Sequence, residues 1–538
     1  MNFRYLFITK HSYHKTNEVI MKQRVLSILA FTFVFFLFTA VSNIEAQRVV
    51  KVSSGVGTLN DAITGDTTAT GARVDPNTIY ELEKDGYYLL TAQITNSGYH
   101  LHIRAEAGGF QRPVIRPGVI SGGVSNRPFQ IKGNLTLDGV YITNLDEQSK
   151  LLQNIIRVSA DNIRLVIKNS HMDRDIQAAI RVDSKFTKIF ITNSIISNIG
   201  EMASPDNGRG VDDRGNAIDT LIMENNTFYN LTSRILRDGG GIIKYVRINH
   251  NTLVNIAQRG VTIGEAIEAH ITNNLFYNCA FLGNLSSNAT PNEVVETSAL
   301  GADYTNQGIK QILDIKNNNF YLSPELSSNY PAGYIAASAM DSIAIAFATK
   351  NGTLASNLNE NVKFSVAPPI PVDVMLGFYD ANVSPKPDMN RGGGTPEYGG
   401  TQSPFNFAYP TSSVLYTKGT SNQPIGALTW FDIQVGVNDE VISQIPEGYE
   451  LFANYPNPFN PTTNIKYALA DKGFVKLSVY NMLGQKVATL VNELQESGLY
   501  TATWNGRADN GISVSSGIYI YKLDAGNFSV SKKMMLVK

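Results

Sequence analysis

Arginine recurs at a nearly constant distance before an asparagine-rich phrase in the middle of the chain. Arg157, Arg181 and Arg237 fall 12, 12 and 13 residues before the third position of the next copy of that phrase. Each arginine follows apolar residues, so we expect it to point outward from a sheet while its neighbours point inward. Cations stacked about 5 Å apart repel one another unless an anionic group lies across them. Because arginine grips carboxylates and sulfates bidentately, the column predicts binding of an acidic polysaccharide.

The coil between Arg181 and Arg237 carries eight extra residues and charges of both signs. In this coil, Asp213 or Arg214 stands 12 or 11 residues before the third position of the next phrase, Asn225, and so near the place of an arginine of the column. We expect Arg209 to bind the same substrate as the column. An insertion of this kind beside the arginines is where a site is expected.

The same insertion holds three aspartates that could bind calcium. Asp206, Asp212 and Asp213 would supply the hard oxygen ligands that Ca²⁺ prefers. Asp212 and Asp213 are adjacent, so in a strand they would point to opposite faces and only one would reach the groove. The alternative is that interleaved aspartates neutralise the arginines as surface pairs of little energetic consequence. That second interpretation involves Asp173, Asp183, Asp212 and Asp238.

A repeated phrase, Ile-x-Asn-[Ser/Asn]-x-apolar-apolar-Asn, must position these charges. Its third position is occupied by Asn144, Asn169, Asn193, Asn225, His250, Asn273 and Asn317, in steps of 25, 24, 32, 25, 23 and 44 residues. Repeats of this length are typical of a solenoid, because one repeat cannot bury its apolar face alone. The runs IRLVIKN and KIFITN alternate with period two, which indicates short strands. We therefore predict a right-handed parallel β-helix in which the third-position amides stack as an interior ladder.

The flanking segments complete the expected organisation. Residues 1–20 form an N-terminal extension, and residues 21–46 have the basic start, apolar run and small-residue end of a secretory signal peptide. We expect the β-helix over 47–321, with a short helix at 58–64 covering its first coil. Residues 322–446 are predicted to be irregular terminal coils, a cap closed by Trp430 and Phe431, and a linker. Residues 447–538 contain six or seven short strands punctuated by glycine, which predicts a small β-sandwich.

Composition narrows the functional classes. The net charge is −1 and the pI about 6.7, so no global basic field favours nucleic acid as a partner. The single cysteine, Cys279, excludes a disulfide framework and is expected to be a buried structural thiol. The mature chain is expected to have no transmembrane segment and to be exported.

The last 80–90 residues resemble a known sorting domain. The sequence NYPNPFNP begins with Asn454, Tyr455, Pro456, Asn457 and Pro458; YNMLGQKV follows at 480–487 and GIYIY at 517–521. This pattern is similar to the type A C-terminal sorting domain of the type IX secretion system. The resemblance implies that residues 447–538 engage that machinery in a Bacteroidetes-type bacterium. The protein would then be secreted or attached to the outer-membrane surface.

The solenoid resembles the pectin-lyase-like β-helix proteins. Within it, SRILRDGGGIIKYVRINHNTLVN at 233–255 is similar to the segment that carries the catalytic arginine in family 6 polysaccharide lyases. The resemblance implies β-elimination at uronates, with Arg237 and Arg214 as the catalytic residues. Arg237 would neutralise the uronate carboxylate, and Arg214 or a nearby tyrosine would transfer the proton. Arg214 is the nearest cation to the position of the family's lysine, and Asp238 stands where the family has histidine. The family's calcium-binding glutamates are missing. These departures favour the alternative of a non-catalytic surface protein that binds glycan or serves as an adhesin or spacer. The arginine column and the charged insertion favour a protein that acts on an acidic polysaccharide, which is the function we expect.

Overall fold

The computed structural model describes residues 47–537 except 110, 119–126, 388, 390–403, 432, 434–448, 470–472, 496–497 and 527. The predicted N-terminal extension at 1–20 and signal peptide at 21–46 therefore lie outside the described residues. Of the segment 322–446, predicted to hold terminal coils, a cap and a linker, residues 388, 390–403, 432 and 434–446 also lie outside them.

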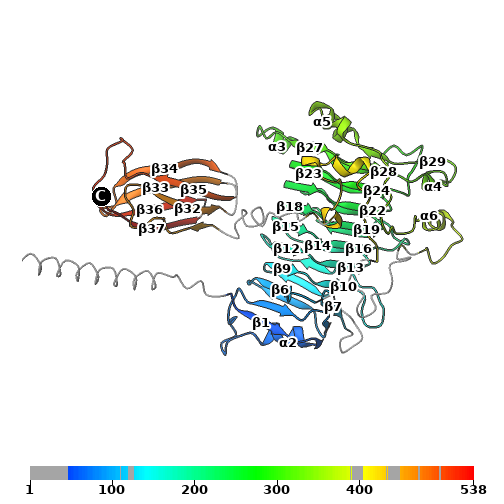
Figure 1. The fold of residues 1–538 in the computed structure, drawn as a ribbon, viewed down its shortest axis with the longest axis horizontal. Helices are drawn as coiled ribbons and strands as arrows, with labels where there is room; N and C mark the ends of the chain where they lie inside the picture. The colour runs from blue at the N-terminus through cyan, green and yellow to red at the C-terminus, as the bar shows by residue number, and fades with distance from the viewer. Residues whose placement is uncertain are drawn as a thin grey trace, which may run out of the picture.

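The chain winds repeatedly through three parallel sheets, which confirms the all-β class and the predicted parallel β-helix (Figure 1). The first sheet contains β1 (Val49–Val52), β3 (Ile79–Leu82), β6 (Leu101–Ala105), β9 (Leu135–Asp138), β12 (Arg164–Lys168), β15 (Thr187–Thr192), β18 (Ile218–Glu224), β21 (Ile243–Asn249), the end of β23 (Val261–Thr272) and β27 (Ile312–Lys316).

The second sheet follows the first within each coil. It contains β2 (Gly55–Val56), β4 (Tyr87–Leu90), β7 (Val114–Pro117), β10 (Tyr141–Thr143), β13 (His171–Asp175), β16 (Ile195–Ile199), β19 (Thr227–Leu231), β22 (Thr252–Ile256), β24 (Leu275–Cys279) and β28 (Asn319–Tyr321).

The third sheet completes each coil and carries the charged residues considered below. It contains β5 (Ile94–Ser97), β8 (Phe129–Lys132), β11 (Ile156–Val158), β14 (Ala178–Val182), β17 (Arg209–Asp212), β20 (Arg234–Arg237), the start of β23, β26 (Glu293–Ser298) and β30 (Ser338–Met340). Because β23 belongs to both sheets, the first and third sheets are continuous there.

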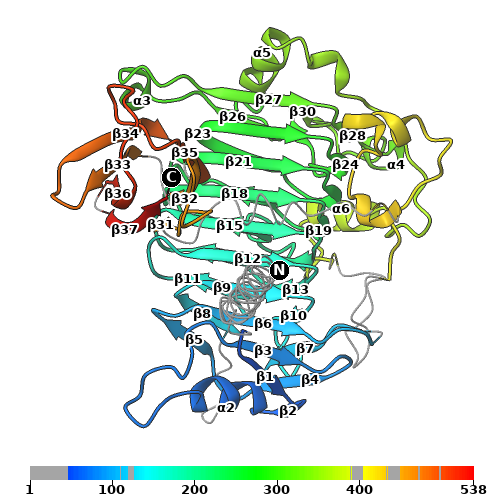
Figure 2. The ribbon, with the colours of Figure 1, turned by 60° about the vertical axis from the view of Figure 1, so that its left-hand side comes forward.

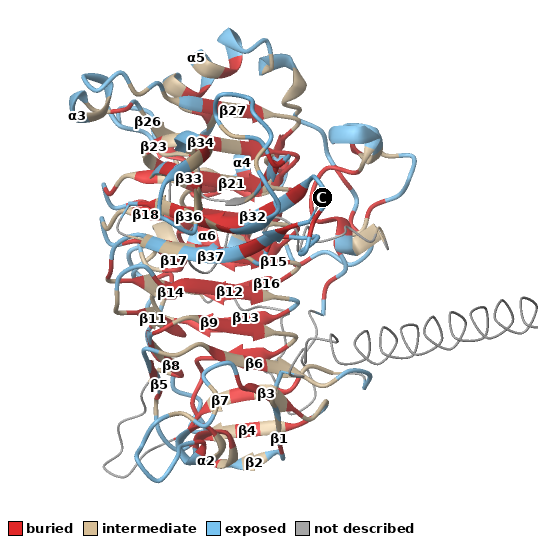
Figure 3. Cartoon of the chain, turned by 90° about the vertical axis from the view of Figure 1, so that its left-hand side faces the viewer, coloured by how far each residue is buried: buried red, intermediate tan, exposed pale blue. Residues whose placement is uncertain are grey.

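The interior is built from columns of like residues. In the first sheet one inward column stacks aliphatic side chains in six successive strands, and all of them are fully buried. Its members are Ile167, Ile191, Met223, Ile248, Ile271 and Ile315. Parallel in-register pairing places equivalent repeat positions above one another, so the period-two pattern of the sequence becomes a continuous apolar core (Figure 3). Cys279 is buried as predicted, and burial raises the pKa of its thiol.

Both ends of the solenoid are covered by helices. At the first end, α2 (Thr58–Gly65) inserts Leu59 and Ile63 into the core, as the sequence predicts for 58–64. At the other end, α5 (Ser342–Lys350) buries Ala344 and Ala348, and the Asp341 side chain accepts a hydrogen bond from the Ala344 amide at its start. Helices cover strand edges that would otherwise be unpaired. Both β30 and α5 follow residue 321, within the segment predicted to hold the terminal coils and cap.

The asparagine ladder exists, but the predicted column is wrong by one residue. The interior ladder is formed by the fourth position of the phrase: Nδ2 of Asn226 donates to Oδ1 of Asn251, and the same 3.0 Å bond is repeated from Asn251 to Asn274 and from Asn274 to Asn318. All four side chains are fully buried. The third position instead turns the chain between the first and second sheets with positive φ, near 50–60°.

Asn144 does not belong to that turn column. The register of β10 with β13 places Gly139, with φ 72°, opposite Asn169, and Asn144 opposite Arg174. The left-handed turn column therefore begins at Gly139, because glycine adopts this conformation without strain. His250 occupies the turn column, where its Nδ1 lies 3.2 Å from the Gly426 carbonyl oxygen.

Residues 404–431, here called the covering segment, run along the turn between the first and second sheets (Figure 2). Three of its aromatic residues, Phe405, Phe407 and Tyr409, pack on the outer face of the second sheet. Trp430 donates from Nε1 to Thr227 Oγ1 at 2.7 Å, which accords with its predicted closing role. The segment's short helices are η2 (Val414–Thr417), η3 (Thr420–Asn422) and η4 (Leu428–Phe431). The remaining elements are β25 (Asn284–Leu285), α3 (Ala302–Thr305), α4 (Pro324–Ser327), β29 (Tyr334–Ile335), η1 (Leu354–Ser356) and α6 (Val372–Tyr379).

The C-terminal residues form an antiparallel sandwich with a core of its own, as predicted. One sheet contains β31 (Glu450–Leu451), β32 (Thr463–Leu469) and β35 (Gly498–Trp504). The other contains β34 (Lys486–Gln495), β33 (Gly473–Asn481), β36 (Gly517–Ala525) and β37 (Phe528–Leu536). Within the described ranges, no helix has the length and apolarity needed to cross a membrane.

Candidate functional site: the arginine face of the third sheet

The three predicted arginines lie in one register column on the third sheet. Arg157 pairs with Arg181, Arg181 with Asp212, and Asp212 with Arg237. The column continues through Thr262 to Glu296. In the coil with the insertion, the column position is therefore Asp212 and not Asp213 or Arg214.

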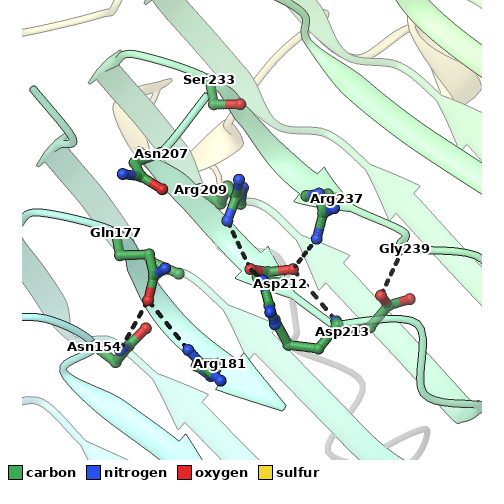
Figure 4. A network of polar contacts seen from close by, with 12 residues as sticks. Asn154, Gln177, Arg181, Asn207, Arg209, Asp212, Asp213, Ser233, Arg237 and Gly239 are labelled. Carbon is green, nitrogen blue, oxygen red and sulfur yellow. Dashed lines mark hydrogen bonds and ion pairs between the residues drawn. The ribbon is translucent and has the colours of Figure 1, made fainter. Parts of the chain in front are cut away.

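Asp212 is the centre of the first charge cluster (Figure 4). Its Oδ2 lies 2.8 Å from Arg209 Nη1, and its Oδ1 lies 3.0 Å from Arg237 Nη1. Arg214 Nη1 is more distant, at 3.8 Å from Oδ2. The Asp212 side chain is fully buried, whereas those of Arg237 and Arg214 are 31% and 40% exposed. A buried carboxylate is thus covered by guanidinium groups that still reach solvent.

Asp183 forms a second cluster one coil earlier. Both Arg157 and Arg181 form ion pairs with it, the latter from Nε to Oδ1 at 2.9 Å. Gln177 Oε1 lies between Arg181 Nη1 and Asn154 Nδ2, at 3.4 and 3.2 Å, and so helps to orient the arginine (Figure 4). The interpretation that aspartates neutralise the row is therefore correct in part, for Asp183 and Asp212.

Two further arginines, which the sequence reasoning missed, extend the face. Arg259 pairs with Glu296 at 2.5 Å, and Arg234 donates to Thr262 Oγ1 at 3.0 Å. Burial, followed by repulsion from Arg259, lowers the pKa of Arg234 to about 10. The sequence does contain a pattern that could have revealed them. Arg209, Arg234 and Arg259 stand three residues before Asp212, Arg237 and Thr262, which are successive members of the column.

Arginine is in excess over this face. Among the described residues, six arginines share three carboxylates within 4 Å, namely Asp183, Asp212 and Glu296. The six are Arg157, Arg181, Arg209, Arg214, Arg237 and Arg259. A seventh arginine of the face, Arg234, bonds the Thr262 hydroxyl instead. Burial lowers the pKa of the Arg209 guanidinium, and the nearby charges of Arg237 and Arg214 lower it further. The face therefore carries a local positive charge on a chain that is nearly neutral overall.

Asp213 and Asp238 belong to the interior and not to the face. They follow Asp212 and Arg237 in adjacent strands, at the register position that Val182 and Ile263 fill in the neighbouring coils. Asp213 Oδ1 accepts from the amides of Gly215 and Gly239 at 2.8 and 2.7 Å. Burial, and then the charge of Asp238, raises the pKa of Asp213 to about 8. Asp238 also has a raised pKa, chiefly because of burial.

The three predicted calcium ligands do not converge. Asp206 is exposed on the turn before β17, Asp212 points to the arginines, and Asp213 points inward. Asp173, proposed as a neutralising charge, lies in the second sheet and bonds Tyr141 Oη at 2.7 Å. No three histidine, cysteine, aspartate or glutamate side chains within the described ranges gather as metal ligands. Asp206, Asp212 and Asp213 therefore do not fit a shared calcium ion.

The predicted sorting motif forms a pinned turn in the C-terminal sandwich. Asn454 is buried: its amide donates to Tyr521 Oη at 3.0 Å, and its Nδ2 donates to Thr463 Oγ1 at 3.0 Å. Asn457 Oδ1 accepts from the Met535 amide at 2.9 Å. Tyr455, between them, is 81% exposed. The motif is thus bonded to β32, β36 and β37, while the Tyr455 ring is exposed to solvent.

The fold is that of a parallel β-helix protein that ends in a small antiparallel β-sandwich with a core of its own. Residues 453–538 match the family described as the secretion system C-terminal sorting domain, so this part of the chain is such a domain. The match implies secretion or surface attachment through the type IX machinery. No curated protein matches the chain.

One similar solved structure comes from a study of PorZ, described as an essential bacterial surface component of the type IX secretion system of Porphyromonas gingivalis. The identity is 19%, over 18% of this chain and 12% of that chain, with a TM-score of 0.13. This chain therefore spans about an eighth of that relative.

Proposed function

We propose that this type IX-exported protein binds an acidic polysaccharide along the arginine face of its third sheet. The observation that carries the proposal is the excess of arginine among the described residues of this face: six guanidinium groups share three carboxylates, and a seventh, that of Arg234, bonds the Thr262 hydroxyl. Arginine binds carboxylates and sulfates with paired hydrogen bonds, which are stronger than neutral ones.

The layout suits a polymer. Residues of one column repeat about every 4.8 Å along the solenoid axis, so a chain lying across the coils meets Arg157, Arg181 and Arg237 in turn. Their side chains are 34%, 22% and 31% exposed and are already held by Asp183 and Asp212. Because these aspartates orient the arginines before binding, less rotamer entropy is lost on binding.

Uronate elimination at Arg237 is the second candidate. Arg237 and Arg214 both reach Asp212, so the pair could neutralise a uronate carboxylate. Elimination also needs a base, and the strands of the third sheet, as described, contain no tyrosine and only one lysine, Lys132. Arginine is a poor general base because its pKa is above about 12. The geometry therefore favours binding.

Affinity electrophoresis in gels containing polygalacturonate tests the proposal. We expect the protein to be retarded by polygalacturonate or a sulfated glycan and not by a neutral glucan. Arg181→Ala should reduce the retardation, whereas Lys316→Ala on the first sheet should not. Equal migration in acidic and neutral gels would refute binding. The ultraviolet absorbance of an unsaturated product, lost in Arg237→Ala, would establish the lyase instead.

A further inference from the structure

A cavity lies away from the arginine face, at the turn between the first and second sheets. It has a volume of about 680 Å³ and opens beside the covering segment. This volume falls within the range of about 300–1,000 Å³ found for small-ligand sites. Its lining includes Lys84, Arg112, Asn169, Asn193, Phe405 and Trp430.

The left-handed turn column continues from the covering segment into this cavity. Asn273 Oδ1 accepts from the Thr420 amide at 2.9 Å, and Asn225 Oδ1 accepts from the Leu428 amide at 2.5 Å. Asn273 and Asn225 thus bind backbone amides of the covering segment. The next members, Asn193 and Asn169, line the cavity.

Asn193 is placed to donate to a ligand. Its Oδ1 accepts from Asn225 Nδ2 at 2.5 Å, while its Nδ2 donates to no residue of the part that the structure describes. Amide groups of this kind suit the hydroxyls of a sugar, which both donate and accept.

Two aromatic rings form the apolar side of the cavity. Trp430 is half-buried and fixed by its bond to Thr227, with its ring 5.4 Å from that of Phe407. Phe405 is buried and packs edge-on against Tyr229 at 5.3 Å. Rings held in this way offer a flat apolar surface whose position costs little conformational entropy on binding.

Two cations define the charge of the ligand. Arg112 donates from Nε to the Asn169 carbonyl oxygen at 2.7 Å, which holds its guanidinium at the turn column. Lys84 also lines the cavity, and its ammonium forms no ion pair with any acid among the described residues. No carboxylate is among the described residues that line the cavity.

We propose that this cavity binds an anionic saccharide of a few residues, with its ring against Trp430, its hydroxyls on Asn193, and its carboxylate or sulfate at Lys84 and Arg112. The site goes beyond the arginine face because it lies on a different side of the coil and uses different residues. A small cavity with an aromatic wall suits a chain end or short oligosaccharide, whereas the open sheet suits the length of a polymer.

Tryptophan fluorescence tests the site directly. The chain has two tryptophans, so Trp504→Phe leaves Trp430 as the sole reporter. Titration of this variant with trigalacturonate should give a saturable change in emission. Lys84→Met should weaken the affinity about tenfold, the effect of losing one charged hydrogen bond. Lys244→Met, on the first sheet, is the matched control and should leave the affinity unchanged.

One further variant and two further ligands distinguish binding in this cavity from binding at the arginine face and identify the ligand that the cavity prefers. Arg181→Ala should leave the emission change intact, so failure of one site does not imply failure of the other. A sulfated disaccharide in place of trigalacturonate shows which anion binds more tightly. The proposal is overturned by the absence of a saturable response to either, or by equal affinity for an uncharged trisaccharide. Tighter binding of a neutral peptide copied from residues 426–431 would also overturn it.

Discussion

Arg237 Nη1 lies 3.0 Å from Oδ1 of Asp212, a carboxylate with no exposed side-chain surface. Arg209 approaches the other oxygen of the same carboxylate at 2.8 Å. Asp212 thus occupies a position in an arginine column and holds arginines from its own strand and from the next. The buried Asp212 carboxylate therefore fixes the positions of arginines that give the face its positive charge.

Asp212→Asn should destabilise the solenoid while preserving its shape. The amide keeps the size of the carboxylate but leaves Arg209, which is 8% exposed, without its counter-charge. Breaking a buried ion pair costs about 3–5 kcal/mol, and we expect about 3 because Arg237 and Arg214 can turn to water. Urea unfolding followed by circular dichroism measures this loss. An unchanged unfolding midpoint would mean that Asp212 does not organise the face.

Asn251→Ala should interrupt the interior ladder. Its Nδ2 donates to Asn274 Oδ1 and to the Met223 carbonyl oxygen at 3.0 and 2.9 Å, and its Oδ1 accepts from Asn226. Unsatisfied buried groups cost about 1–3 kcal/mol each, so the free energy of unfolding should fall by at least about 2 kcal/mol. Asn169→Gly, at an exposed position of the turn column, is the control. Equal losses in the two variants would contradict the assignment of the ladder to the fourth position.

The stability of the solenoid should fall as the pH rises from about 4 to 8. Asp213 has a pKa raised to about 8 and Asp175 one raised to about 7, in both cases first by burial. In the unfolded chain an aspartate has a pKa of about 3.9, so between about pH 4 and the higher native pKa the folded state keeps a proton that the unfolded state has lost. The stabilisation from such a group is complete below about pH 4 and is lost as the pH rises to the native pKa.

Asp213→Asn removes the main titrating group of the Asp213–Asp238 pair. The difference in unfolding free energy between pH 5 and pH 8, measured in urea, should therefore shrink in this variant. An undiminished difference would show that Asp213 does not carry the effect.

The sorting domain should unfold separately from the solenoid. Trp504 is 1% exposed within the sandwich core, and its Nε1 donates to the Arg507 carbonyl oxygen at 2.8 Å. Trp504→Ala should cost about 3–5 kcal/mol. Calorimetry should show that one transition shifts while the other stays, because the solenoid core contains none of these residues. A single transition that shifts as a whole would contradict two independent cores.

Several features followed from the sequence because they depend on periodicity. The coil length fixed the β-helix, and the constant offset placed Arg157, Arg181 and Arg237 in one column. The ladder was misplaced because Asn225 and Asn226 are adjacent and share one repeat, so spacing cannot tell a turn amide from a buried one. Only the backbone conformation separates them.

Other features leave no periodic trace. The covering segment has no repeat, so nothing in the sequence indicated that Thr420 and Leu428 would bind Asn273 and Asn225. The sequence predicted Asp213 as a calcium ligand and Asp238 as a surface charge, because aspartate seldom replaces a valine or isoleucine inside a core. Their burial depends on glycine amides contributed by neighbouring coils.

The affinity of the protein for polygalacturonate tests the central claim most directly. Calorimetric titration should compare the wild type with a triple variant, Arg157→Ala/Arg181→Ala/Arg237→Ala, and a control of equal charge change, Lys168→Ala/Lys244→Ala/Lys316→Ala. Each charged contact is worth about tenfold, so the arginine variant should bind at least about a hundredfold more weakly. The lysine variant should stay within about threefold of the wild type. Equal affinity in both variants, or equal loss in both, would contradict the assignment of the third sheet as the glycan-binding face.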